Sequence, residues 1–235
     1  HNQKKADAPV VFGQLTQKDG AFLVSRTENA SFSVNDLKNK EILAGRKGGV
    51  PAMSFEYMLK NSGLTENDYT LNFDVQFNMM TSAFISGIAD YCTVFEPTAS
   101  EYEKQGKWHV VASVGELTGE IPYTSFIALE SFINNNSETL KSFMKALKKA
   151  YDFMSKSSDL EIAQSILKQF PSTSVESIET SVKNYRKIDA WKTDMQATES
   201  SFDNLQNVME SAGELTSRVA FNKIVNNTIA KEIFG

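Results

Sequence analysis

The sequence has few of the residues that build metal centres and covalent catalysts: among 235 residues there are one cysteine, Cys92, and two histidines, His1 and His109. A single cysteine excludes an internal disulfide and a cysteine-rich zinc site. Cys92 lies in the apolar stretch 88–95, which is typical of a buried strand and favours a packed thiol over a nucleophile. Neither histidine has a second histidine or the cysteine at a ligand-like spacing, so the sequence predicts no metal site, no cofactor and no catalytic residue.

An excess of positive charge and a long apolar run are also absent. The 24 Lys and Arg against 29 Asp and Glu leave a net charge of −5, which excludes a general binder of nucleic-acid phosphates. No apolar stretch approaches the roughly 18 residues that a membrane-spanning helix needs, and residues 1–8 lack the apolar core of a signal peptide. With 16 Phe and 7 Tyr to bury, we expect one large domain or two smaller ones without a membrane span.

Strand and helix patterns alternate through the first half of the chain. The sequence predicts strands at 9–16, 21–25, 41–45, 69–75, 88–95 and 108–114. A turn-like loop at 17–20 separates the first two strands, and helices are expected at 51–59, 78–85 and 98–105. This order predicts an α/β sheet with right-handed crossovers.

The second half of the chain is predicted to be almost wholly helical. From Asn136 to Met154 apolar residues recur at helical spacing, and the lysines between them are interpreted as a solvated face rather than a binding patch. Two capping boxes, Ser158 with Glu161 and Thr173 with Glu176, are expected to open two further helices. A last clear helix ends at Gly213.

One strand-to-helix turn has the composition of a binding loop. Gly48 and Gly49 let a ligand approach the backbone closely, and the helix that begins near Pro51 directs its free N–H groups towards that space. The motif is neither a Walker loop nor the dinucleotide fingerprint. A plain tight turn with Arg46 and Lys47 in solvent remains the alternative.

A carboxylate follows another predicted strand directly. In Phe95-Glu96-Pro97, Glu96 comes at the carboxyl end of the strand, where open α/β sheets bind their ligands. A loop glutamate before a helix-starting proline is the competing interpretation.

These residues carry a resemblance to a known family. The stretch 36–51, then 83–90, Phe95-Glu96-Pro97 and Pro122-Tyr123-Thr124 resemble the substrate-binding proteins of ABC importers, in the subgroup for nitrate, alkylsulfonates and thiamine pyrimidine precursors. The resemblance implies an α/β, two-lobed type II periplasmic-binding-protein fold with a helical C-terminal region. It implies that residues 1–33 and 124–235 form lobe I and residues 34–123 lobe II. Relative to that fold, the N-terminal units of lobe I and the export signal are expected to be absent from this chain.

The resemblance also implies a ligand site in the cleft between the lobes. Its first part is the glycine turn with the following helix start, and its second part is Glu96 in the family's aromatic-acid-proline motif, with Phe95 in place of the more frequent Trp. The segments that cross between the lobes supply further positions, and the residues after the alternating strand are weaker candidates. In full, the implied ligand-binding residues are Lys47, Gly48, Gly49, Val50, Glu96, Gln14, Thr16, Tyr123, Thr124, Gln76 and Phe77.

A helix N-terminus facing a carboxylate suits a ligand with both an acceptor and a donor group, such as an aminopyrimidine, better than bare nitrate. We therefore expect Glu96→Gln to weaken binding by about 1–3 kcal/mol. The implied partners are a small-molecule ligand and a membrane permease, with no nucleic acid. The implied location of the protein is outside the cytoplasm.

Two alternative functions stay open at this point. Pyrimidine-precursor synthases of fungi resemble this fold, but they use a cysteine-rich run and active-site histidines that this sequence lacks. The ligand-sensing effector domain of a transcription regulator is the second alternative, and it needs a basic helix-turn-helix segment, which we do not expect ahead of His1.

Overall fold

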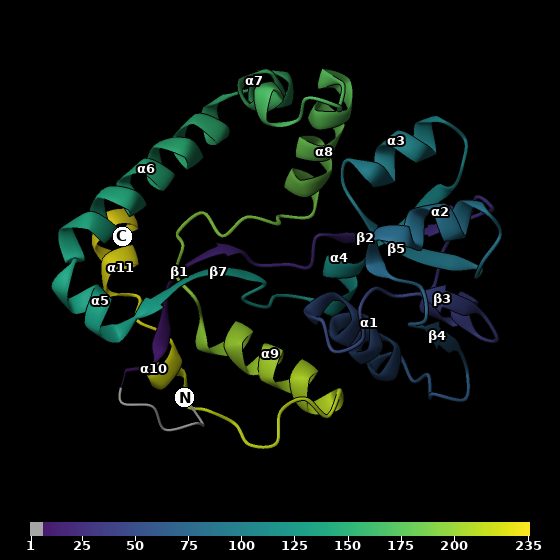
Figure 1. Cartoon of the computed structure of the whole chain (residues 1–235), viewed down its shortest axis with the longest axis horizontal. Coiled ribbons are helices and arrows are strands. Elements are labelled where there is room, and N and C mark those ends of the chain that lie inside the picture. Colours follow the sequence, from purple (N-terminus) through teal and green to yellow (C-terminus); the bar gives the residue numbers. More distant parts are fainter. Residues whose placement is uncertain (1–6) are drawn as a thin grey trace.

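The computed structural model describes residues 7–235, which form one five-stranded sheet and a separate two-stranded pair (Figure 1). The large sheet has the order β4-β3-β5-β2-β6, and β1 pairs with β7. The strands are β1 (Pro9–Thr16), β2 (Ala21–Ser25), β3 (Glu41–Leu43), β4 (Thr70–Asn72), β5 (Tyr91–Phe95), β6 (His109–Ser113) and β7 (Thr124–Leu129).

The centre of the large sheet is built from the most apolar strands. Every residue of β2 is buried, as expected for a strand with neighbours on both edges and helices on both faces. The strands β3, β4 and β5 run parallel, whereas β2 is antiparallel to both β5 and β6. The large sheet is therefore mixed rather than purely parallel.

Helices cover both faces of this sheet and bury two separate cores. Leu23 packs on one face with Phe55 of α1, and Phe22 and Val24 pack on the other with Trp108. This alternation follows from the two-residue period of a strand. The helices of this lobe are α1 (Val50–Asn61), α2 (Met80–Ile85), α3 (Thr98–Lys104) and α4 (Val114–Thr118), with 3-10 turns at Val34–Leu37 and Phe77–Met79.

The β1–β7 pair has its own core, in which Phe12 and Met144 pack with Ile229. The helices around it are α5 (Glu130–Asn135), α6 (Ser137–Lys156), α10 (Phe221–Ile224) and α11 (Thr228–Phe234). Within residues 7–235 every helix, including the 20-residue α6, is too short or too polar to cross a bilayer.

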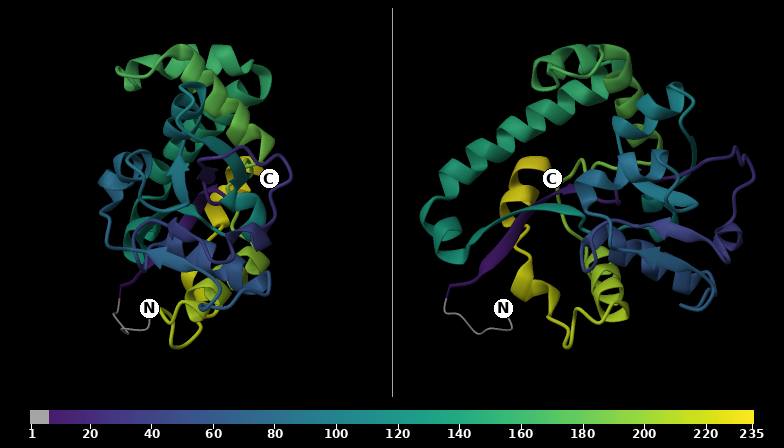
Figure 2. Two further views of the ribbon diagram at one scale, coloured as in Figure 1. Left: turned by 90° about the vertical axis from the view of Figure 1, so that its right-hand side faces the viewer. Right: turned by 45° about the vertical axis from the view of Figure 1, so that its right-hand side comes forward.

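Three further helices connect the two parts: α7 (Asp159–Ile166), α8 (Val175–Lys187) and α9 (Glu199–Ser211), with a 3-10 turn at Leu167–Gln169. Figures 1 and 2 show α6 leading away from the β1–β7 pair to α7 and α8. The helix α8 then contacts α3, and α9 contacts α1. The helical C-terminal region therefore reaches back to the large sheet.

This arrangement corrects the predicted lobe boundary. Placing residues 1–33 in lobe I is wrong for Ala21–Ser25, because these residues form the strand β2 inside the large sheet. The turn-like loop at 17–20 consequently connects strands of two different sheets. Similarly, 124–235 is not confined to lobe I, because α8 and α9 pack against helices of the large sheet.

Two local predictions also need correction. The alternating segment 69–75 forms a strand only at Thr70–Asn72, because the side-chain oxygen of Asn72 accepts a hydrogen bond from the Asp74 backbone and turns the chain. The helix α8 does not begin with a Thr173–Glu176 box: its N-cap is Ser174, whose Oγ accepts from the backbone N–H of Ser177.

The capping box of α7 is confirmed. The Ser158 side chain accepts from the Glu161 N–H, and the Glu161 carboxylate accepts from the Ser158 N–H. The last clear helix, α9, stops before Gly213, which has a positive φ of 74°.

Candidate ligand site

The glycine turn has the geometry that the sequence predicts. The strand β3 leads through Gly45 and Gly48, with φ of 99° and 73°, into Gly49, the N-cap of α1. No side chain caps this helix, and its first turn has no acidic residue. Because the first N–H groups of a helix have no partner within it, this end of α1 can receive an anionic or acceptor group.

A carboxylate already lies close to this turn. A Cβ placed on Gly48 would be 3.2 Å from Oε1 of Glu214, which follows α9. Lys47 is exposed, and Val50 is half-buried as the first residue of α1. The tertiary structure thus places a carboxylate oxygen beside the position that a Gly48 side chain would occupy.

The Glu96 carboxylate has more partners than the sequence suggests. Its Oε1 accepts hydrogen bonds from Ser100 Oγ at 2.7 Å and from Asn184 Nδ2 at 2.6 Å, and its Oε2 accepts from the Ser100 N–H at 3.1 Å. The backbone N–H of Glu96 donates to the Tyr185 hydroxyl at 3.3 Å. Glu96 therefore ties the end of β5 to α3 and α8.

Gln76 and Phe77 lie in an exposed 3-10 turn rather than at the end of a long strand. The Phe77 ring packs edge-on against Phe95 with 6.2 Å between the ring centroids. These two rings, together with Thr93 and Met80, line part of a cavity of about 250 Å³ at the carboxyl end of β5. The structure therefore brings Phe77 beside Phe95 at the carboxyl end of β5.

The predicted ligand residues on the two segments that cross between the lobes come together where β1 and β7 meet the large sheet. They are Gln14, Thr16, Tyr123 and Thr124. Thr16 pairs with Thr124 in the β1–β7 ladder. The fully buried Gln14 donates through Nε2 to the carbonyl oxygens of Thr16 at 3.1 Å and Ile121 at 3.4 Å. Thr124 is exposed and Tyr123 is half-buried. Gln14 therefore stabilises both crossing segments at once.

Sequence reasoning missed Asp19, the most unusual side chain of this junction. Its exposed fraction is 0%, and burial raises its pKa from 3.8 to about 6, while the hydrogen bond from the Ala21 N–H and the nearby Tyr123 hydroxyl act in the opposite direction. Burial, with Asp19 nearby, also raises the pKa of Tyr123. The sequence Gln17-Lys18-Asp19-Gly20 has the composition of a surface turn, so nothing in it signals a buried carboxyl.

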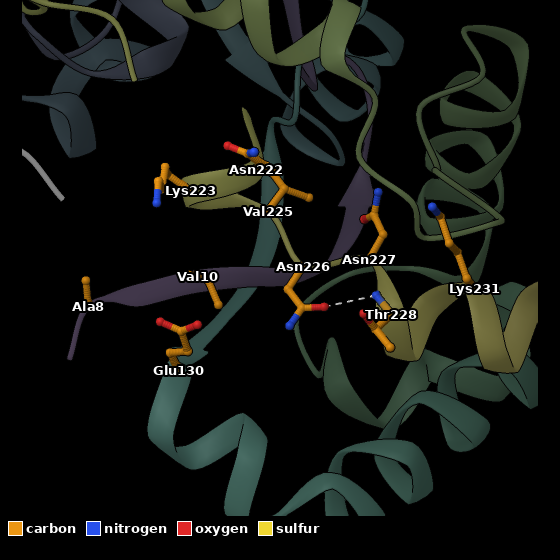
Figure 3. A pocket seen from close by; sticks show the side chains of 10 residues that line it. All are labelled: Ala8, Val10, Glu130, Asn222, Lys223, Val225, Asn226, Asn227, Thr228 and Lys231. Atoms are coloured by element: carbon orange, nitrogen blue, oxygen red, sulfur yellow. Dashed lines mark hydrogen bonds between the residues drawn. The ribbon is translucent and has the colours of Figure 1, made fainter. Parts of the chain in front are cut away.

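Another cavity lies away from the predicted ligand residues. A cavity of about 470 Å³ lies between β1, α10 and α11, and Figure 3 shows Val10, Glu130, Asn226 and Lys231 around it. A hydrogen bond from the Thr228 N–H to Asn226 Oδ1 closes one side. None of the predicted ligand residues lines this cavity, so we do not assign it to the site.

The lone thiol is packed as the sequence predicts. Cys92 is fully buried in β5, and burial raises its pKa to about 12. Within the described residues no group of three or more His, Cys, Asp or Glu side chains could hold a metal ion.

We expect Cys92 to be unreactive towards a thiol reagent such as 5,5′-dithiobis(2-nitrobenzoate) in the native protein and to react at once in 6 M guanidinium chloride. The physical reason is that only the thiolate attacks the reagent, and burial suppresses it. Absorbance at 412 nm measures the reaction. Rapid labelling of the native protein would contradict the buried position.

Comparison with known proteins decides the family. Residues 1–159 match the family described as NMT1/THI5 like. The chain belongs to the NMT1/THI5-like family. A curated relative, the "Putative binding protein YtlA" of Bacillus subtilis (strain 168), is 38% identical over 232 residues, which are 98% of this chain and 70% of that protein.

Solved structures confirm the fold of this NMT1/THI5-like protein. The alkanesulfonate-binding protein SsuA from Xanthomonas axonopodis pv. citri bound to MOPS matches with a TM-score of 0.67 and 19% identity, over 93% of this chain and 73% of that one. The periplasmic aliphatic sulphonate binding protein SsuA from Escherichia coli matches with a TM-score of 0.67 and 15% identity, over 93% and 69%. The desulfurization enzyme DSZB also matches, with a TM-score of 0.59 and 10% identity over 96% and 78%. The predicted binding-protein fold is thus confirmed, and the same fold also occurs in an enzyme.

Proposed function

We propose that this NMT1/THI5-like protein is the solute-binding component of an ABC importer. It binds a small polar or anionic molecule between the two lobes, outside the cytoplasm, and delivers it to a membrane permease. The relative described as a binding protein and the sulfonate-binding proteins of the same fold support this proposal.

The observation that carries the proposal is the uncapped start of α1. It lies at the carboxyl ends of β3 and β5, the edge at which open α/β sheets bind ligands. The approach of Glu214 to Gly48 supports an acceptor group at this turn. Lys47 adds a positive charge beside it without an ion-pair partner among residues 7–235.

The ligand class follows from the two kinds of group at this edge. The start of α1 suits a sulfonate or a ring nitrogen, and the cavity beside Phe77 and Phe95 suits an aliphatic or aromatic carbon skeleton. We therefore propose an alkylsulfonate or a pyrimidine precursor of thiamine as ligand, with Gln14, Thr16, Tyr123, Thr124, Gln76, Glu96 and Val50 as further wall residues.

A catalytic function has less support. The buried Cys92 cannot serve as a nucleophile in this arrangement, because its thiol is held neutral and inaccessible. We accordingly propose binding without a chemical step.

Gly48→Ala is expected to weaken the binding of ethanesulfonate or 4-aminopyrimidine about tenfold. An alanine is strained at the positive φ of Gly48, and its Cβ would meet Glu214, so the turn must change shape. Isothermal titration calorimetry at neutral pH, with nitrate as a third probe, measures the effect and the ligand class together.

Gly63→Ala is the matched control. Gly63 has a similar φ of 83° and follows the other end of α1, with no atom within 4 Å of an added Cβ. The Gly63→Ala substitution imposes comparable backbone strain away from the site and should leave the affinity for the ligand unchanged. Equal affinities of both variants would count against the glycine turn as the ligand site, and binding of nitrate alone would exclude both proposed ligand classes.

A further inference from the structure

The buried carboxyl of Asp19 has an unused hydrogen-bonding atom. Its Oδ1 accepts from the Ala21 N–H at 2.8 Å, whereas its Oδ2 has no partner of ordinary hydrogen-bond geometry among the described residues. No Lys, Arg or His within residues 7–235 forms an ion pair with it. A fully buried carboxyl group without a cation and with an unpaired oxygen is costly for a fold, so its presence calls for an explanation.

Asp19 lies at the same edge of the large sheet as the proposed ligand site, the edge with the carboxyl ends of β3 and β5. Ala21, two residues after it, pairs with Phe95, the last residue of β5, and Phe22 pairs with Ser113 at the end of β6. On the opposite side, Gly115 of α4 contacts the Asp19 backbone. The carboxyl group is therefore enclosed between the carboxyl ends of two strands, beside the crossing to lobe I.

The crossing segments beside Asp19 hold several polar side chains. The Oε1 atom of the fully buried Gln14, in the crossing at the end of β1, also has no hydrogen-bond partner among the described residues. The titratable neighbours are Tyr123, whose hydroxyl reaches the carboxyl group, and Tyr185, whose hydroxyl donates to the Gly20 carbonyl at 3.2 Å. The charged side chain of Asp189 is bound by Gln17 at 2.9 Å. This junction therefore holds unpaired acceptor atoms, and no ion pair within residues 7–235 satisfies Asp19.

Glu96 is a weaker candidate than Asp19 for accepting a hydrogen bond from an N–H group of the ligand. Its carboxylate already receives three hydrogen bonds, from Ser100 and Asn184, whereas Asp19 receives one from the backbone and has the Tyr123 hydroxyl nearby. A ligand amine would have to displace three hydrogen bonds at Glu96, but only the Tyr123 hydroxyl at Asp19.

We propose that Asp19 determines ligand specificity: its Oδ2 accepts a hydrogen bond from a protonated amine or ring N–H of the ligand. This inference rests on the proposed function, because it assumes that the acceptor end of the same ligand lies at the glycine turn. Tyr123 is half-buried and its hydroxyl lies near Asp19, so the proposed ligand group would take the place of this hydroxyl. The ligand class is consequently a small molecule with an anionic or acceptor group at one end and a cationic or N–H donor at the other.

Two ligand pairs that differ only in the donor group test this assignment. The first pair is 2-aminoethanesulfonate and ethanesulfonate, and the second is 4-aminopyrimidine and 4-methylpyrimidine. In whichever pair binds, titration calorimetry of the full chain at pH 7.5 should show that the compound with the amino group binds at least about tenfold more tightly than its partner. Hydrogen bonds to charged groups contribute a free energy of this size. Asp19→Asn should reduce the preference to less than about threefold while the affinity for the partner without an amino group stays the same.

Asp189→Asn is the matched control, because it removes a carboxylate from the same junction, and asparagine tolerates its φ of 51°. It should keep the preference of the unchanged protein. Tight binding with no preference for the amino member, or a preference that survives Asp19→Asn, overturns the role of Asp19 and leaves the proposed function intact. Binding of neither pair at millimolar concentration overturns the proposed ligand class together with this inference.

Discussion

Replacing Asp19 by asparagine should stabilise the protein by about 2 kcal/mol at pH 7.5. Asparagine keeps an oxygen for the Ala21 N–H and has no charge to bury. The pKa of Asp19 rises from 3.8 to about 6 on folding, and about two pKa units correspond to about 3 kcal/mol. We expect part of this gain to be lost, because the new amide N–H groups also need partners in a buried position.

The direction of the pH dependence follows from this raised pKa. Between pH 3.8 and about 6 the folded protein binds more protons at Asp19 than the unfolded chain does. The contribution of Asp19 to stability is therefore fully present below pH 3.8 and is lost as the pH rises through about 6. The difference in unfolding free energy between Asp19→Asn and the unchanged protein should consequently grow from pH 4 to pH 7.

Urea unfolding followed by circular dichroism at several pH values between 4 and 7.5 measures this difference. Because all other titrating groups are common to both proteins, the difference isolates Asp19. Asp189→Asn serves as the control and should shift stability by less than about 1 kcal/mol. A constant difference across the pH range would mean that Asp19 is hydrated rather than buried.

Gly115→Ala should destabilise the protein by about 3 kcal/mol or more. Gly115 lies in the first turn of α4, and an added Cβ would be 2.3 Å from the Asp19 carbonyl oxygen and 3.0 Å from its backbone nitrogen. These are backbone atoms of the crossing between the lobes, so they cannot rotate away as a side chain could. The crossing segment would have to move.

Helix propensity alone predicts that Gly115→Ala stabilises the protein, which is the opposite of the change expected here. In a helix without such a contact, alanine in place of glycine stabilises by up to about 1 kcal/mol. Glu116→Ala, at the next and exposed position of α4, should change stability by less than about 0.5 kcal/mol. Thermal and urea unfolding of both variants provide the comparison, and a stabilised Gly115→Ala protein would show that the crossing does not contact α4 this closely.

The two expected effects concern one junction. The raised pKa of Asp19 predicts a loss of stability at neutral pH, and its backbone lies close to Gly115. A residue that costs stability and is nevertheless enclosed by several elements is typical of a binding site, where function and stability compete. The assignment of ligand recognition to Asp19 rests on its buried carboxyl group and unpartnered Oδ2, and this expected cost agrees with it.

Much of the local structure could be predicted from the sequence. The helix at Val50–Asn61, the capping box of Ser158 and the strand of Cys92 follow from residue periods and cap chemistry within a few neighbouring positions. The strand expected at 69–75 was too long, because the alternation of residues does not reveal the hydrogen bond that turns the chain after Asn72.

The candidate site was predictable only where a local motif marks it. Gly48 and Gly49 indicate a turn before a helix, and the structure has that turn. The partners of Glu96 include Asn184, which lies 88 residues away, so the sequence could not reveal that this carboxylate is already bound. The residues proposed for the ligand remain a prediction that the variants above can test.

The sequence by itself determined the strand and helix types, the packed thiol and the resemblance to an importer binding protein, because each depends on residue order within short windows. Only the tertiary structure decided that β2 belongs to the large sheet, that Glu96 binds α3 and α8, and that Asp19 is buried without a cation. These facts depend on which distant segments meet. A carboxylate acquires a raised pKa or an unpaired oxygen only from the neighbours that folding brings to it.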